Sequence, residues 1–487
     1  MSRSLVIIGG GVAGLAAGCY ARMNGYDVEI HEMHHHPGGL CTAWTRQGYT
    51  FDLCIDWLTG SAPGSSLYPV WEELGIVQGR KFIDPEYFGI ALDESGDRFT
   101  AWTDPDRLEE EMLRYGPEDG KFIHEFVSGI KRLMKVEMPM DSGFAALLKL
   151  LPALGTFNKY SIPVSTLTER ITNPRLREFF RNIFDWHDQS AIFLMFMLAY
   201  MARRSAGYPL GGSVPVVRAM EQRYLSLGGL IRYGSKVVEV LVENDRAVGV
   251  RLEDGTVIRS DLVLSAADGY STIFQWLPEK YADPRIQELY RDLKPFPPLV
   301  FVSMGVDGDY SKEPWTISFP LKKPIKVGEK DVTRLLVRNH ARDPAMAPRG
   351  KSVFTTPIET DYAFWERILY HSDQYREEKD RICKEVPAAL DEIYPGILDR
   401  LEVTDVATPH TFIRYTGNWK GSYEGWLMTK KTMSLRFPQK LQGLAGFYMA
   451  GQWVAPGGGL PGATTSARSA IRLLCKDEKR SFVSLKP

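Results

Sequence analysis

Three glycines near the N-terminus have the spacing of a nucleotide-binding turn. Gly9, Gly11 and Gly14 form a G-x-G-x-x-G pattern between a short apolar run and a helix-prone stretch. The first glycine permits a tight turn, the second lets backbone approach a pyrophosphate, and the third lets the helix pack closely on the strand. Val12 and Ala13 stand at the predicted helix start, where N–H groups and the helix dipole attract phosphate.

The element after this turn supplies a carboxylate where such a site needs one. Residues 27–32 alternate in polarity and predict a strand that ends in Glu32. Glu32 follows Gly14 by 18 residues. An acid that binds the ribose usually follows the glycine motif by ~20 residues. A carboxylate there accepts hydrogen bonds from the hydroxyls of an adenosine ribose, so we predict a dinucleotide site that uses Glu32.

Three consecutive histidines follow Glu32. His34, His35 and His36 stand in a predicted loop, without the H-x-x-x-H or C-x-x-C spacing that metal sites use. Neighbouring side chains in such a loop point in different directions. We therefore expect solvated histidines and predict no metal site.

The composition is typical of a globular protein, with 44% hydrophobic and 24% charged residues. The chain of 487 residues is longer than a domain with one hydrophobic core usually is, so we expect two domains with a ligand between them. The formal net charge is -1, and no long basic run occurs. This charge pattern predicts no nucleic-acid partner.

Several features bear on the cellular setting. The chain passes from its first residues directly into an apolar run without a signal-peptide pattern, which predicts a cytoplasmic protein. Five cysteines without a C-x-x-C pair predict reduced thiols. The longest apolar run, residues 191–201, is too short to span a membrane and predicts a buried core helix. A membrane-surface or substrate-lining helix is the alternative, so a peripheral membrane contact stays open.

Two further stretches carry a family resemblance. Gly38 and Gly39 follow the predicted ribose-binding acid and precede an aromatic-Asp pair, an order that resembles the flavin amine-oxidoreductase superfamily. In that superfamily the second glycine pair also faces the phosphates of FAD. Residues 231–242 predict a strand, and the stretch 208–268 that contains them resembles the middle FAD segment of the same superfamily. By this resemblance the backbone of Val237 would meet the adenine, and Ala266 would lie near the dinucleotide.

The C-terminal stretch closely resembles the phytoene desaturase and retinol saturase branch of that superfamily. A strand runs into Gly451 and Gln452, and a Pro/Gly loop then leads to a helix expected from about residue 463, with the loop's last residues Gly459, Leu460, Pro461 and Gly462. A helix start of this kind places N–H dipoles against the flavin pyrimidine, where negative charge develops on reduction. The sequence departs from its relatives at Gln452, where many have an acid, and at Cys54, where the pattern has glycine. The second departure puts a thiol near the flavin.

The resemblance implies an α/β fold with a Rossmann-like FAD-binding domain of the GR2 type and an inserted α+β substrate domain. We expect residues 1–85, 205–285 and 435–487 to form the discontinuous FAD-binding domain, and residues 86–204 and 286–434 to form the substrate domain. Within the substrate domain we expect a mainly helical first insertion, a charged helix over about 375–393, and a returning strand over 408–417.

The implied function is an FAD-dependent oxidoreductase that adds or removes hydrogen across C–C bonds of an apolar isoprenoid or polyene. Desaturation, saturation and double-bond isomerisation stay open, as does the electron acceptor. Asp185, His187, Asp188, Arg414 and Tyr415 are candidates for supplying a proton. No second glycine motif with a trailing acid occurs in residues 90–440, so we expect no stably bound nicotinamide cofactor.

Two alternatives remain at this stage. A flavin amine oxidase would have a short, aromatic-lined pocket that is polar at one end. A non-catalytic prenyl-lipid escort is the other alternative, because the fold also resembles the GDP-dissociation inhibitors, which bind no flavin. The intact glycine motifs and Glu32 favour the enzyme.

Overall fold

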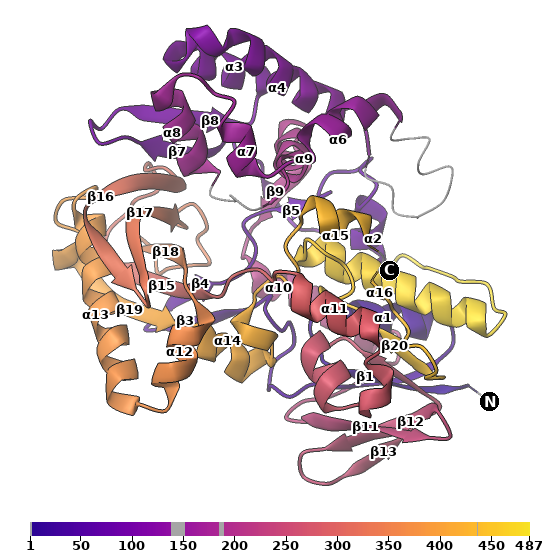
Figure 1. Cartoon of the computed structure of the whole chain (residues 1–487). Coiled ribbons are helices and arrows are strands. Elements are labelled where there is room, and N and C mark those ends of the chain that lie inside the picture. The colour runs from indigo at the N-terminus through magenta and orange to yellow at the C-terminus, as the bar shows by residue number, and fades with distance from the viewer. Residues whose placement is uncertain (1, 138–150, 185–188, 436) are drawn as a thin grey trace.

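The computed structural model describes residues 2–137, 151–184, 189–435 and 437–487. One half of the molecule is built on a five-stranded parallel sheet (Figure 1). Its strands, in sheet order, are β10 (Leu230–Arg232), β2 (Asp27–His31), β1 (Ser4–Ile8), β14 (Leu262–Ser265) and β20 (Phe447–Met449). Three separated stretches of the chain therefore contribute to one sheet.

Both faces of this sheet are covered, which explains the continuous apolar run of β1. Leu5 and Ile7 pack in one hydrophobic core, whereas Val6 and Ile8 pack in another on the opposite face. The long helices of this half are α1 (Val12–Met23), α10 (Ser213–Ser226) and α16 (Gly459–Asp477). Helix α1 packs against the other two. The opposite face carries the antiparallel sheet of β11 (Val237–Glu243), β12 (Arg246–Leu252) and β13 (Val257–Arg259).

The other half is built on a seven-stranded sheet to which both insertions contribute. The first insertion supplies β7 (Tyr87–Leu92) and β8 (Arg98–Trp102), and β7 pairs in parallel with β16 of the second. The other strands are β15 (Leu299–Val306), β16 (Thr316–Val327), β17 (Lys330–Asn339), β18 (Ser352–Glu359) and β19 (Leu401–Ala407). Helices α12 (Tyr362–Leu369) and α13 (Ser372–Asp391) flank this sheet (Figure 1).

The rest of the first insertion is helical and has its own core. Its helices are α3 (Pro105–Tyr115), α4 (Gly120–Leu133), α6 (Leu154–Tyr160), α7 (Val164–Thr168), α8 (Pro174–Ile183) and α9 (Ala191–Ala202). Helix α9 is apolar on all sides, and most of its residues are buried in this core. No helix in the parts of the chain that the structure describes is long and apolar enough to cross a membrane.

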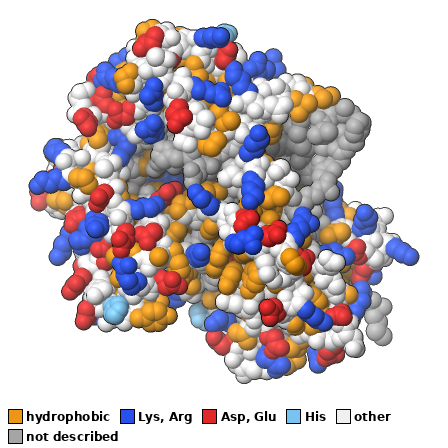
Figure 2. Space-filling model, viewed as in Figure 1, with side chains coloured by type: hydrophobic (Ala, Val, Ile, Leu, Met, Phe, Trp, Pro, Cys, Tyr) orange, Lys and Arg blue, Asp and Glu red, His pale blue; other side chains and the backbone are white. Residues whose placement is uncertain are grey.

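Short elements connect the two halves. They are β3 (Ala43–Arg46), β4 (Tyr49–Asp52), β5 (Leu58–Thr59), α2 (Tyr68–Glu73), β6 (Phe82–Ile83), β9 (Ala206–Pro209), α11 (Pro284–Asp292), α14 (Pro409–Thr416) and α15 (Lys430–Ser434). On the face in Figure 2, acidic and basic side chains are interspersed, as the net charge of -1 suggests.

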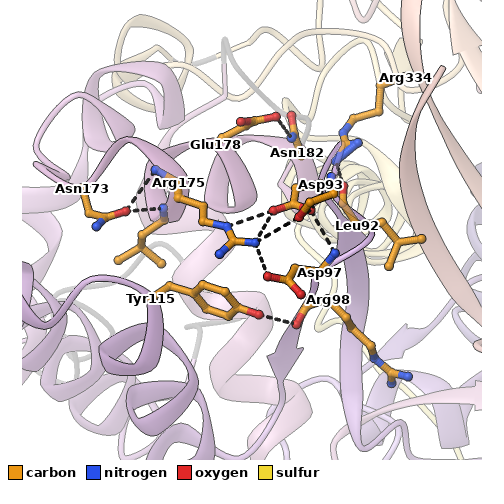
Figure 3. A network of polar contacts seen from close by, with 12 residues as sticks. Leu92, Asp93, Asp97, Arg98, Tyr115, Asn173, Arg175, Glu178, Asn182 and Arg334 are labelled. Atoms are coloured by element: carbon orange, nitrogen blue, oxygen red, sulfur yellow. Dashed lines mark hydrogen bonds and ion pairs between the residues drawn. The ribbon is translucent and has the colours of Figure 1, made fainter. Parts of the chain in front are cut away.

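A polar network joins α8 to the β7–β8 hairpin (Figure 3). Arg175 donates through Nε to Asp93 Oδ2 at 2.9 Å and also pairs with Asp97. Asn173 caps α8 by accepting from the N–H groups of Arg175 and Leu176. The Arg175 side chain is 41% exposed. These ion pairs therefore contribute more to the specific packing of α8 on the β7–β8 hairpin than to the free energy of unfolding.

Three sequence expectations about elements were wrong. Residues 408–417 do not form a strand: Thr408 caps α14, Pro409 occupies its first turn, and Gly417 ends it in the left-handed conformation at φ 68°. The strand expected from 231 to 242 is divided into β10 and β11 by a turn with a left-handed glycine at 234. Helix α16 begins at Gly459, before the expected position 463, because the glycines themselves enter the first turn.

Asp52 joins the β3–β4 hairpin to the start of α10. Its buried carboxylate accepts from the backbone N–H and the hydroxyl of Ser213, each at 2.6 Å, and from the N–H of Cys54 at 3.0 Å. A side-chain carbon on Gly212 would lie 2.2 Å from this carboxylate, so only glycine allows the contact. The hairpin that carries Cys41 and Cys54 is thereby held against the parallel-sheet half.

Replacing Asp52 should therefore destabilise the fold. We expect Asp52→Ala to lower the free energy of unfolding by about 3 kcal/mol, because several buried donors lose their acceptor. Asp254→Ala removes an exposed turn carboxylate and should cost within about 0.5 kcal/mol. Urea denaturation of both variants checks this expectation. Equal losses in the two would show that the Asp52 contacts do not stabilise the fold.

Candidate flavin site

The glycine turn after β1 has the geometry that its spacing predicts. Gly9 adopts φ 95°, and its N–H donates to the carbonyl of His31 at 2.8 Å. A side-chain carbon at Gly14 would lie 1.9 Å from the Gly9 carbonyl oxygen, so α1 packs against the turn only with glycine there. Gly11 is the N-cap of α1. The N-terminal N–H groups of the helix are thus held at the end of β1.

The second glycine pair lies directly against this turn. The N–H of Gly38 donates to the carbonyl of Gly10 at 3.0 Å, and Gly11 and Gly38 form an isolated β-bridge. Gly38 and Gly39 both have left-handed φ values, 118° and 60°. Side chains are therefore absent from both glycine turns where they meet, which leaves room for a ligand to approach the backbone.

Glu32 lies at the end of β2 and is 6% exposed. Its Oε2 accepts from the N–H of Gly10 at 2.6 Å, and its Oε1 accepts from the N–H of His34 at 2.8 Å. Burial raises the pKa of this carboxyl, whereas the backbone hydrogen bonds lower it. Each oxygen has accepting capacity left for a hydroxyl of a ligand. The pair of acceptor oxygens thus fits the two hydroxyls of a ribose diol.

The residues that follow the strands of the parallel sheet line one cleft of about 740 Å³. Because parallel strands end at the same edge, the residues that follow them come together there. The predicted residues that line the cleft are Gly9, Gly11, Val12, Ala13, Glu32, Gly38, Gly39, Val237, Ala266, Gly451, Gln452, Gly459, Leu460 and Pro461. Gly14 and Gly462 are not among the lining residues. Gly14 serves the packing of α1, and the Gly462 N–H donates to the Gly458 carbonyl at 3.3 Å.

The start of α16 forms another wall of the cleft. Gly457, Gly458 and Gly459 have consecutive left-handed φ values of 87°, 52° and 65°. Because these residues carry no side chains, the first N–H groups of the helix are accessible from the cleft. The side chain of Gln452 is held at the wall of the cleft, because its amide donates a hydrogen bond to Asn418 Oδ1 at 3.2 Å.

Of the five residues predicted as proton donors, the structure describes two. Arg414 and Tyr415 line the cleft from α14, and the Tyr415 ring lies 5.0 Å from the ring of His34, beside the Glu32 end. Asp185, His187 and Asp188 lie outside the residues that the structure describes.

The expectation that the three histidine rings diverge was wrong. The centroid of the His34 ring lies 5.3 Å from that of His36 and 6.0 Å from that of His35. His35 and His36 are nevertheless exposed. In the described part of the chain, no three His, Cys, Asp or Glu side chains are grouped so that they could hold a metal ion.

Sequence reasoning missed a group of charged residues that lie near one another in the cleft. Asp56 and Arg338 form an ion pair with 2.7 Å between Oδ2 and Nη2, and Glu424 lines the cleft near them. They come from three distant stretches, two of them inside the second insertion. Their spacing in the chain carries no signal, since only the tertiary packing of two loops against β17 brings them together.

The comparisons with known proteins agree with this geometry. The sequence profile described as flavin containing amine oxidoreductase matches residues 12–474, so the chain belongs to that family. It is 26% identical over 506 residues to a phytoene desaturase (neurosporene-forming) of Cereibacter sphaeroides, covering 96% of this chain and 94% of that protein. It is 24% identical over 473 residues to an all-trans-retinol 13,14-reductase of Danio rerio, covering 86% and 77%.

The fold also matches solved structures. An oxidoreductase from Methanosarcina mazei superposes with a TM-score of 0.61 at 18% identity, covering 96% of this chain and 100% of that one. The α/β fold with an inserted domain is thereby confirmed as the amine-oxidoreductase fold. The protein is a flavin-dependent oxidoreductase, as the sequence predicted.

The geometry at Glu32 generates a direct test. We expect Glu32→Ala to weaken flavin-dinucleotide binding by roughly tenfold to a hundredfold, because a charge-assisted contact to the ribose is lost. The double variant His35→Ala/His36→Ala changes only exposed side chains and should bind normally. Equilibrium titration followed by flavin fluorescence measures both affinities. Equal weakening in the two variants would contradict a ribose-binding role for Glu32.

Proposed function

We propose that this protein is an FAD-dependent oxidoreductase that adds or removes hydrogen across a C–C bond of a long apolar isoprenoid or polyene. The observation that carries the proposal is the continuity of the cleft. The glycine turns and Glu32 line the same cleft as a set of apolar side chains from both insertions. The relatives named above, which act by their names on carotenoid and retinoid compounds, support the same substrate class.

FAD fits the polar part of the cleft residue by residue. Glu32 would hold the adenosine ribose, and the N-terminus of α1 with Gly38 and Gly39 would face the pyrophosphate. The N-terminus of α16 would face the ring system, where its dipole favours negative charge. When bound, FAD supplies a two-electron centre that accepts or gives a hydride. The chain itself binds and orients both partners and excludes water.

The apolar part of the cleft suits an elongated hydrocarbon. Its walls come from α9, the loop after β4, the seven-stranded sheet and α14. The side chains that form them are Trp57, Phe193, Tyr200, Leu299, Phe301, Leu336, Pro357 and Phe412. Burial of a hydrocarbon against such side chains contributes about 25 cal/mol per Å². A dry apolar wall beside the cofactor also holds a substrate carbon in place without competing water.

A flavin amine oxidase would use the same fold, and one experiment separates the two reactions. Anaerobic mixing of the FAD-loaded protein with dispersed phytoene or all-trans-retinol should bleach the flavin absorbance if hydrogen is removed. If hydrogen is added instead, the dithionite-reduced protein should be reoxidised by a carotenoid acceptor. Redox response to putrescine or benzylamine alone would contradict the proposal and favour an amine substrate.

Helix α9 allows substrate contact and folding to be tested separately. Phe193 faces the cleft and is partly exposed, whereas its neighbour Leu194 is fully buried in the helical core. We expect Phe193→Ala to weaken isoprenoid binding by about 1 to 2 kcal/mol with little change in melting temperature. Leu194→Ala should cost about 2 to 5 kcal/mol of folding stability. Thermal unfolding and binding of a fluorescent polyene measure both. Loss of stability without loss of affinity in Phe193→Ala would contradict a substrate contact.

A further inference from the structure

A carboxylate without an assigned role lies in the cleft. Glu424 belongs to the loop between a 3-10 turn (Trp419–Gly421) and α15, and its side chain lines the cleft. Among the residues that the structure describes, no group donates a hydrogen bond to this carboxylate. Glu424 is half-buried, and a carboxylate that loses part of its water without gaining a donor is costly, so its presence at a ligand-binding wall calls for a function.

The glycines before α16 are shaped around Glu424. A side-chain carbon at Gly458 would lie 2.5 Å from the Glu424 carbonyl oxygen and 2.7 Å from its Cβ. A side-chain carbon at Gly459 would lie 3.6 Å from the carboxylate oxygen Oε1. The bare backbone therefore lets Glu424 approach the beginning of the helix that faces the flavin ring in the proposed function. The glycine run serves the carboxylate as well as the cofactor.

The charges around Glu424 leave it without a full counter-charge. Asp56, on the loop after β4, and Arg338, on β17, form the ion pair described above and neutralise each other. Cys54, on the same loop as Asp56, also lies within electrostatic reach of Glu424. Burial, and next the negative charge of Asp56, raise the pKa of Glu424 to about 7, whereas Arg338 lowers it. The carboxyl can thus gain or lose a proton near neutral pH.

We propose that Glu424 is the catalytic acid and base of this cleft, moving the proton that accompanies hydride transfer between substrate and flavin. The inference rests on the proposed function. In the desaturating direction, one carbon of a CH–CH unit loses a hydride, with its electron pair, to the flavin. The neighbouring carbon loses a proton to the Glu424 carboxylate, and the electron pair of that C–H bond becomes the second bond of the C=C unit. In the saturating direction, protonated Glu424 donates to one alkene carbon and the other receives the hydride.

The reduction potential of bound FAD tests this placement without any substrate. An ionised carboxylate beside the ring disfavours added electrons, so reduction should draw a proton onto Glu424. Between pH about 7 and the higher pKa that Glu424 takes in the reduced protein, we expect the wild-type protein to take up more protons per two electrons than Glu424→Gln, up to one more. Glu424→Asp should retain the extra proton. Asp254→Asn, which changes an exposed carboxylate outside the cleft, should behave as wild type.

Two further measurements complete the test. Because the folded-state pKa is raised, the ionised form opposes folding, so the Glu424→Gln apoprotein should melt higher than wild type at pH 8 and equally at pH 4, below the ordinary pKa of a glutamate. With phytoene as probe, flavin bleaching in Glu424→Gln should be roughly a hundredfold slower at unchanged substrate affinity. Parallel potentials in wild type and Glu424→Gln would overturn the inference. Failure of the wild type to retain FAD would instead overturn the proposed function.

Discussion

The close approach of α1 to β1 at Gly14 is the contact on which the rest of the site depends. Since a Cβ atom there would lie 1.9 Å from the Gly9 carbonyl oxygen, any other residue would push the helix away from the turn. With the helix in place, its N-terminus opens at the edge of the parallel sheet where Glu32, Ala266 and Gly451 also follow their strands. Four stretches of chain thereby face one ligand, and the hydrogen bond from Gly10 to Glu32 fixes the carboxylate among them.

The insertions complete the cleft rather than forming an independent site. Because β7 pairs with β16, the two insertions share a sheet, and its strands present Phe301 and Leu336 to the same space that the glycine turns line. Helix α9 closes another side with Phe193, while its remaining residues hold the helical core together. In the proposed function, the groups that would bind the cofactor and those that would bind the hydrocarbon therefore come from different elements. The cofactor would be held by backbone N–H groups and Glu32, and the hydrocarbon by burial against side chains.

The sequence predicted the parallel-sheet half well, because its signals are local. The glycine spacing, the acid at Glu32 and the apolar strands each reflect a contact between residues close in the chain. The segment 408–417 was misread because resemblance outweighed the helix-start signal of Thr408-Pro409 and the helix-end signal of Gly417. Asp56, Arg338 and Glu424 could not be predicted, since their proximity depends on how two loops from distant parts of the chain pack against β17. The roles of Arg414 and Tyr415 stay predictions.

We propose that one FAD binds across the glycine turns, Glu32 and the start of α16. The most direct measurement is a titration of the purified apoprotein with FAD, followed by absorbance and by equilibrium dialysis against the mononucleotide FMN. We expect saturation at one FAD per chain and far weaker binding of FMN, which lacks the adenosine ribose that Glu32 would hold. Equal affinity for FMN, or no binding of FAD at all, would contradict this proposal.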